Sequence, residues 1–157
     1  MERMGLILAL VAATGCGQPV DVAKAVQVDV ATSGWRFVGV VDGKNKIVPS
    51  VVLTLRNVSG QKLDALQTNA VFRLASTNAD FGADFRPLAG SGGLPAASSI
   101  EKITLKSERG YTGTDPVDEL LNNSRFGDAK VEVFVKAGAG QWTRIGEYPI
   151  ARQLTGD

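Results

Sequence analysis

The sequence predicts a mostly β protein: an antiparallel β-sandwich of seven to eight strands with one short helix. Apolar and polar residues alternate over several short runs, as in a strand with one buried and one solvent-exposed face. Turns rich in Gly, Asn, Asp and Pro separate these runs. With 157 residues, 44% of them hydrophobic, the chain is long enough to bury one core. An up-and-down barrel is the alternative arrangement of the same strands.

The first strands are predicted as a hairpin. Residues 26–30 read Val-Gln-Val-Asp-Val, and the extended run 35–41 ends at the Asp-Gly dipeptide 42–43, which suits a tight turn. Extended character resumes over 47–55. Pro49 cannot donate to a ladder, so it is expected at the start of a strand or on an edge.

Three further extended runs follow in the middle of the chain, over residues 63–75, 81–88 and 99–106. The second is irregular, because its apolar residues do not share one face. In the third, Ile100 is out of phase with the later alternation. A bulge near Glu101 would restore the phase.

The longest break, 107–130, contains the predicted helix. Asp115 is expected to cap it, with Pro116 in the first helical position and the end near 122–123. After this break, the runs 131–136 and 142–150 flank an Ala-Gly-Ala-Gly turn and form the clearest predicted hairpin.

The middle of the chain resembles the immunoglobulin-like domains of many bacterial envelope lipoproteins. The segments that carry the resemblance are LTLRNVSGQKL (53–63) and LPAASSIEKITLKS (94–107). They share a strand ending in Asn, a turn of small residues, and a later Leu-Pro approach to another strand. The resemblance implies an immunoglobulin-like sandwich. An antibody-type domain is not expected, since the paired cysteines are missing.

The amino-terminal segment MERMGLILALVAATGC has the layout of a secretory signal. Arg3 gives a positive start, residues 6–13 are apolar, and small residues precede Cys16. At about 1.5 Å per residue the apolar stretch covers roughly 12 Å, far less than the roughly 30 Å of a bilayer core. A spanning helix is therefore not predicted. The alternative is a buried helix or a first strand.

The motif Ala-Thr-Gly-Cys at 13–16 resembles the lipobox of bacterial lipoproteins. The resemblance implies cleavage after Gly15, a diacylglycerol on the Cys16 thiol and stable membrane anchoring by the acyl chains. It also explains a single cysteine in an exported chain. A free thiol or an intermolecular disulfide is the other explanation.

The expected organisation is a signal peptide over 1–15, a lipidated tether over 16–24 and a β-sandwich domain over 25–157. The expected location is a bacterial membrane, anchored by lipid and facing the periplasm or the cell surface. Gly17 stands where some inner-membrane lipoproteins have Asp, so by resemblance the outer membrane is favoured.

The composition excludes several kinds of chemistry. The chain has no histidine and one cysteine, which removes His-based and Cys-based nucleophiles and zinc sites. The net charge is +1 and the basic residues are scattered, so the sequence predicts no basic patch that would bind nucleic acid. Two pairs of carboxylates have simpler explanations than chemistry. Asp80 and Asp84 are expected in a solvated loop, and Asp115 and Asp118 are expected to cap the helix. The sequence thus predicts no catalytic residue, no cofactor and no metal site.

Two functions are consistent with these features. The first is a non-catalytic, membrane-anchored module that meets protein subunits of an envelope assembly through a sheet edge or loops. The second is a carbohydrate- or small-ligand-binding module using exposed aromatic residues, with Trp35, Trp142 and Tyr111 as candidates. Burial of these rings within the sandwich is the competing interpretation.

Overall fold

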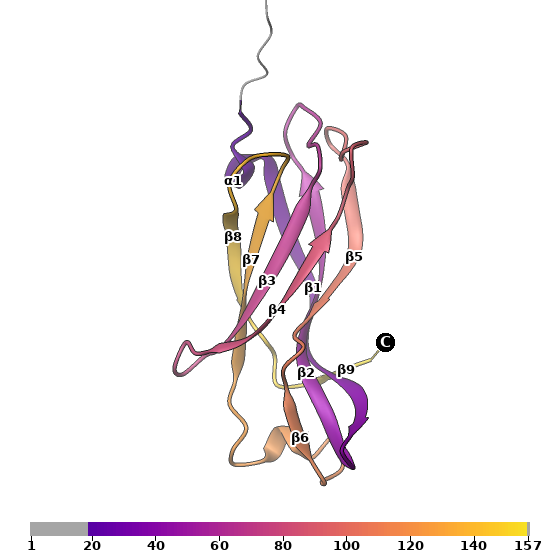
Figure 1. Ribbon diagram of the computed structural model, residues 1–157, viewed down its shortest axis with the longest axis vertical. Helices are drawn as coiled ribbons and strands as arrows, with labels where there is room; N and C mark the ends of the chain where they lie inside the picture. Colours follow the sequence, from indigo (N-terminus) through magenta and orange to yellow (C-terminus); the bar gives the residue numbers. More distant parts are fainter. Residues whose placement is uncertain (1–18, 157) are drawn as a thin grey trace, which may run out of the picture.

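The computed structural model describes residues 19–156. Two β-sheets lie face to face and enclose the core (Figure 1), which confirms the predicted β-sandwich. The described residues contain nine strands, two of them very short, together with one α-helix and one 3₁₀ helix. The elements are α1 (Val22–Ala25), β1 (Val26–Val41), β2 (Lys44–Asn57), β3 (Gln67–Leu74), β4 (Asp80–Pro87), β5 (Ser99–Lys106), β6 (Tyr111–Gly113), η1 (Leu120–Asn122), β7 (Ala129–Lys136), β8 (Thr143–Pro149) and β9 (Leu154–Thr155).

The first sheet has the strand order β5-β2-β1-β9, with β6 also paired to β2. Its long hairpin turns where the sequence predicts, since Asp42 and Gly43 have φ values of 50° and 73°. Both central residues of a type I′ turn need positive φ, which explains the Asp-Gly pair. The short strand β9 pairs with β1 in parallel, a departure from the expected antiparallel pattern.

Pro49 lies inside β2, whereas the sequence predicts it at a strand start or an edge. It is opposite Trp35 of β1. On the other side of β2, pairing with β6 stops at Ile47 and pairing with β5 starts at Ser50. Pro49 therefore occupies a break between two partner strands, where the missing N–H is not needed.

The second sheet has the order β4-β3-β7-β8, and all of its pairings are antiparallel. Its inner face supplies Phe72, Val131 and Val133, each fully buried. The facing residues of β2 are Val51 and Leu53, which are also fully buried. Alternation in β3, in β7 and in the second half of β2 therefore produces much of the core that the sequence predicts.

The predicted helix and the predicted tether both differ from the structure. Residues 117–119 form a turn, and η1 follows without a side-chain cap, so Asp115 does not cap a helix. The α-helix of the structure lies instead in the segment predicted as tether. Asp21 caps α1 by accepting the Ala23 N–H at 3.2 Å, and Val22 is only 5% exposed. One apolar turn packed on the core is enough to order this segment.

Candidate functional site

Of the residues that the sequence singles out, Cys16 lies outside the described residues. Trp35 on β1 is 0% exposed. Its ring centroid lies 4.6 Å from that of Phe126, 5.5 Å from Tyr111 and 6.2 Å from Phe81. The expectation that Trp35 offers an exposed ring is therefore corrected, because the ring is enclosed in an aromatic cluster of the core.

Tyr111 on β6 belongs to the same cluster but is only half-buried. Its Oη donates to the Gly127 carbonyl at 3.3 Å and accepts the Gly127 N–H at 2.9 Å. These bonds tie the long loop to the sandwich. Tyr111 also lines a pocket of about 350 Å³ with Leu120 and Phe126. Tyr111 therefore packs in the aromatic cluster and also lines this pocket.

Trp142, just before β8, is 40% exposed and takes no part in that cluster. Its ring meets Phe85 of β4 edge to face at 6.2 Å, and Lys136 Nζ lies 5.9 Å from its centroid. We call Phe85 and Trp142 the outer aromatic pair. The sequence analysis missed Phe85, which is 54% exposed.

A bulge in β4 explains the exposure of Phe85. Pairing with β3 shifts between Val71 and Arg73, and Gly82 has a φ of 101°. The extra residue turns Phe81 toward Trp35 and leaves Phe85 on the outer face. Phe81 and Phe85 therefore lie on opposite faces of β4 because of how this strand pairs with β3.

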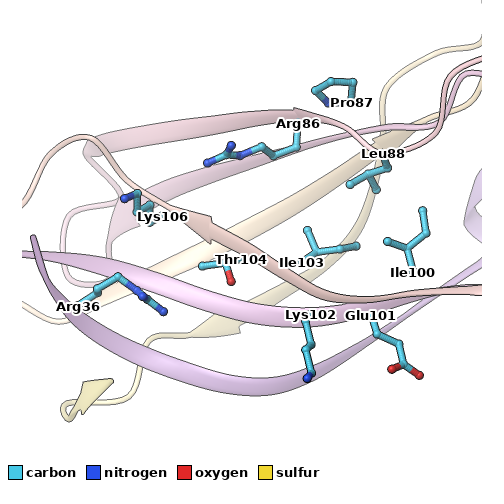
Figure 2. Close-up of a pocket in the computed structure, with 10 residues that line it drawn as sticks. All are labelled: Arg36, Arg86, Pro87, Leu88, Ile100, Glu101, Lys102, Ile103, Thr104 and Lys106. Atoms are coloured by element: carbon cyan, nitrogen blue, oxygen red, sulfur yellow. The ribbon is translucent and has the colours of Figure 1, made fainter. Parts of the chain in front are cut away.

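The groove with the strongest charge pattern lies between β4 and β5, the edge strands on one side of the sandwich (Figure 2). We call it the edge groove. It has a volume of about 600 Å³. Figure 2 shows Leu88 and Ile100 near one end and Arg86 with Lys106 toward the other. Its lining consists of Arg36, Arg86, Pro87, Leu88, Ile100, Glu101, Lys102, Ile103, Thr104 and Lys106.

Asp84 links β4 to β5 at one end of the edge groove. Its carboxylate lies 3.0 Å from Arg86 Nε and also accepts the backbone N–H of Lys106 at 3.0 Å. Nearby, Ser107 Oγ donates to the Phe81 carbonyl at 2.6 Å. These contacts join the edges of β4 and β5 at this end and position the Arg86 guanidinium at the groove wall. The predicted solvated loop at Asp84 is instead part of a strand.

The cations of the edge groove differ from those on the second sheet. Glu132 on β7 pairs with both Arg73 at 2.8 Å and Arg144 at 2.9 Å, so that face is neutralised. Lys102 and Lys106 form no ion pair with any described residue. Among the residues that line the groove, Arg86 is paired with Asp84, so its unpaired cations are Lys102 and Lys106, against the single carboxylate Glu101. The groove is therefore suited to a negatively charged partner.

A second hollow of about 660 Å³ continues this cationic surface over the outer face of the first sheet. It shares Arg36, Lys102 and Thr104 with the edge groove. Residues 153–156 lie on its other side. These cations are scattered along the sequence, which predicts only solvated side chains; pairing of β1, β2 and β5 brings them together.

The other candidate carboxylates are engaged or dispersed. Asp80 on β4 forms an ion pair with Arg109 at 3.0 Å. Within residues 19–156 no three Asp, Glu or Cys side chains gather as metal ligands would. In the same part of the chain, every helix is too short or too polar to cross a membrane.

Comparison with known proteins finds similarity among solved structures alone. The chain matches no family model and no curated protein. It is similar to a solved structure described as the X-ray structure of Northeast Structural Genomics Consortium target SoR45, with 13% identity and a TM-score of 0.47. The match covers 83% of this chain and 89% of that chain.

Proposed function

We propose that this chain is a non-catalytic interaction module of the bacterial cell envelope. A lipid on Cys16 anchors it to a membrane, with the outer membrane favoured, and it binds a protein subunit of an envelope assembly. The observation that carries the proposal is the edge groove, where a cationic surface runs beside an unpaired strand edge. Such an edge binds through backbone groups and needs no reactive side chain.

The chemical inventory supports a binding role. The sequence has no histidine, and its single cysteine is the proposed lipid site. Asp80 and Asp84, one of the two carboxylate pairs that the sequence offers, form ion pairs with Arg109 and Arg86. Carboxylates in ion pairs stabilise the joint between the sheets and are poor candidates for general acid catalysis.

The arrangement also suits a lipid anchor. The helix α1, which begins six positions after Cys16, lies at the end of the sandwich opposite β6 (Figure 1). The edge groove runs along the side of the body. A lipid at Cys16 would hold the α1 end near the membrane while the groove stays accessible to a partner.

The experiment is affinity purification of the full chain from crosslinked, gently solubilised membranes. We expect one protein to co-purify in constant ratio, and to be lost when Lys102 and Lys106 are both replaced by Glu. The control is Lys44→Glu, which makes the same kind of substitution once, at the hairpin; each single variant, Lys102→Glu and Lys106→Glu, is compared with it at equal charge change. Recovery of the chain alone, after crosslinking as well as without it, would contradict the proposal.

Carbohydrate or small-ligand binding is the second candidate, favoured by the outer aromatic pair. Cross-strand register places Phe85, Asn69, Phe134 and Arg144 in one row on the outer face of the second sheet. Exposed rings beside amide and cationic groups suit stacking against sugars. In this case Trp142→Ala and Phe85→Ala would abolish retention on a glycan column, and the Glu variants of the groove would be retained normally.

A further inference from the structure

We propose that the edge groove takes an extended, acidic segment of the partner protein, and that this segment adds as a strand to the free edge of β5. The inference rests on the proposed function, because it gives the chemistry of the partner for the same module. Three observations carry it: the direction of the β5 backbone, the charges along the groove and the apolar residues on its floor.

The free edge of β5 presents backbone groups to the groove. The Ser107 N–H points toward β2, where it donates to the Pro49 carbonyl at 3.0 Å. The Lys106 N–H points the other way and donates to Asp84. Because successive N–H groups alternate between the two sides of a strand, the Thr104 N–H also faces the groove. From Ser99 to Thr104 no other described strand covers this edge.

The charges select an acidic segment and disfavour a second copy of the same edge. Lys102 and Lys106 are exposed and lack ion pairs among the described residues, and Arg86 stands at the opposite wall. Lysine on an edge strand opposes pairing with a like strand through charge repulsion. The bulge at 101–102, where Lys102 has a φ of 55°, interrupts the edge, so regular pairing with an added segment is expected beyond it, from Ile103 onward. A segment bearing carboxylates reverses the sign of the interaction.

The floor of the groove favours a polypeptide over other anions. Leu88 and Ile100 are half-buried, and Ile103 is 8% exposed. An extended segment places alternate side chains on opposite faces, so it can direct apolar groups onto this floor and carboxylates toward the lysines. A lipid headgroup or a free anion would use the cations alone.

The test measures binding of two fluorescent peptides of about ten residues, one alternating Val with Glu and the other Val with Lys. The protein is the full chain carrying Cys16→Ser, so that the lipid does not contribute. We expect the Glu peptide alone to bind, and its affinity to fall on raising the salt from about 0.1 M to about 1 M. The double variant K102E/K106E should weaken binding at least about tenfold. The control K44E should change it less than about twofold.

Hydrogen exchange locates the peptide. We expect the Thr104 amide to become protected in the complex while exchange on the β8 edge stays unchanged. Equal binding of both peptides, an affinity insensitive to K102E/K106E, or an unprotected Thr104 amide would each overturn the inference. Binding to phosphatidylglycerol vesicles but not to the Glu peptide would also overturn it and assign the groove to lipid.

The two proposals fail in different ways. If the Glu peptide does not bind, but a protein co-purifies with the unaltered chain and is lost with the K102E/K106E chain, the inference is wrong and the interaction module remains. If no protein co-purifies with the unaltered chain, the proposed function is wrong.

Discussion

Asn57 shows how one side chain connects distant parts of this sequence. It is fully buried at the end of β2, and its Nδ2 lies 3.1 Å from the Leu94 carbonyl and 3.0 Å from that of Pro95. Its Oδ1 accepts the Ser59 N–H at 3.0 Å. The strand-ending Asn and the later Leu-Pro pair are the features behind the resemblance to immunoglobulin-like domains. The structure joins them by hydrogen bonds.

Replacing Asn57 with Ala should lower the free energy of unfolding by about 2–4 kcal/mol, because buried carbonyls would lose their donor. Urea unfolding followed by circular dichroism measures the change. Ser59→Ala, which keeps the Asn57 bonds to Leu94 and Pro95, is the control and should cost less. Equal losses would show that those two bonds add little.

The tryptophans should respond very differently to truncation. Trp35→Ala removes a fully buried ring and should cost about 3–5 kcal/mol of stability. Trp35→Phe should cost less, because no described residue accepts a hydrogen bond from Trp35 Nε1 and the ring volume is mostly kept. Trp142→Ala should cost less than about 1 kcal/mol, since its ring is exposed. Similar unfolding midpoints for the two Ala variants would contradict these assignments.

At the scale of elements, the sequence predicted the strands with regular alternation, but it predicted only one of the two β-bulges near Glu101 and Gly82. The bulge expected near Glu101 is confirmed by the register shift between β2 and β5. It was predictable because Ile100 and Ile103 break the alternation of the sequence. The bulge near Gly82 was not predicted. A glycine beside Phe81 fits several backbone conformations, and only pairing with β3 selects the one with positive φ.

Glu132 connects three strands of the second sheet through Arg73 on β3 and Arg144 on β8. The hydrogen bond from Arg73 lowers the pKa of Glu132 below its ordinary value of 4.5; burial opposes this effect, and Arg144 adds to it. A carboxylate with a lowered folded-state pKa stabilises the protein above the unfolded pKa. That stability is lost as the pH falls through the folded value.

Glu132→Gln should therefore lower stability at pH 7 by about 1–2 kcal/mol, since Gln keeps the shape but not the charge. Below about pH 4.5 the difference from the unaltered chain should shrink as Glu132 becomes protonated. Urea midpoints at several pH values measure this. A difference that stays constant down to pH 3 would show that the charge of Glu132 contributes nothing.

At the scale of the whole molecule, the proposed lipid on Cys16 predicts how the protein partitions. Cys16→Ser should move the protein from the detergent phase to the aqueous phase in a phase-partition assay, because the acyl chains are lost. Detergent partition that persists in the Ser variant would contradict lipidation at Cys16.

The sequence by itself determined the β class, the long hairpin turn at Asp42 and the alternating core of β2, β3 and β7. These features depend on local backbone preference and on a period of two, which the order of residues records directly. The tertiary structure alone decided the burial of Trp35, the exposure of Phe85 and the gathering of Arg86 and Lys106 at the edge groove. The reason is that these features depend on which strands meet. Strand pairing joins residues far apart in the chain through backbone hydrogen bonds, which carry no sequence signal of their own.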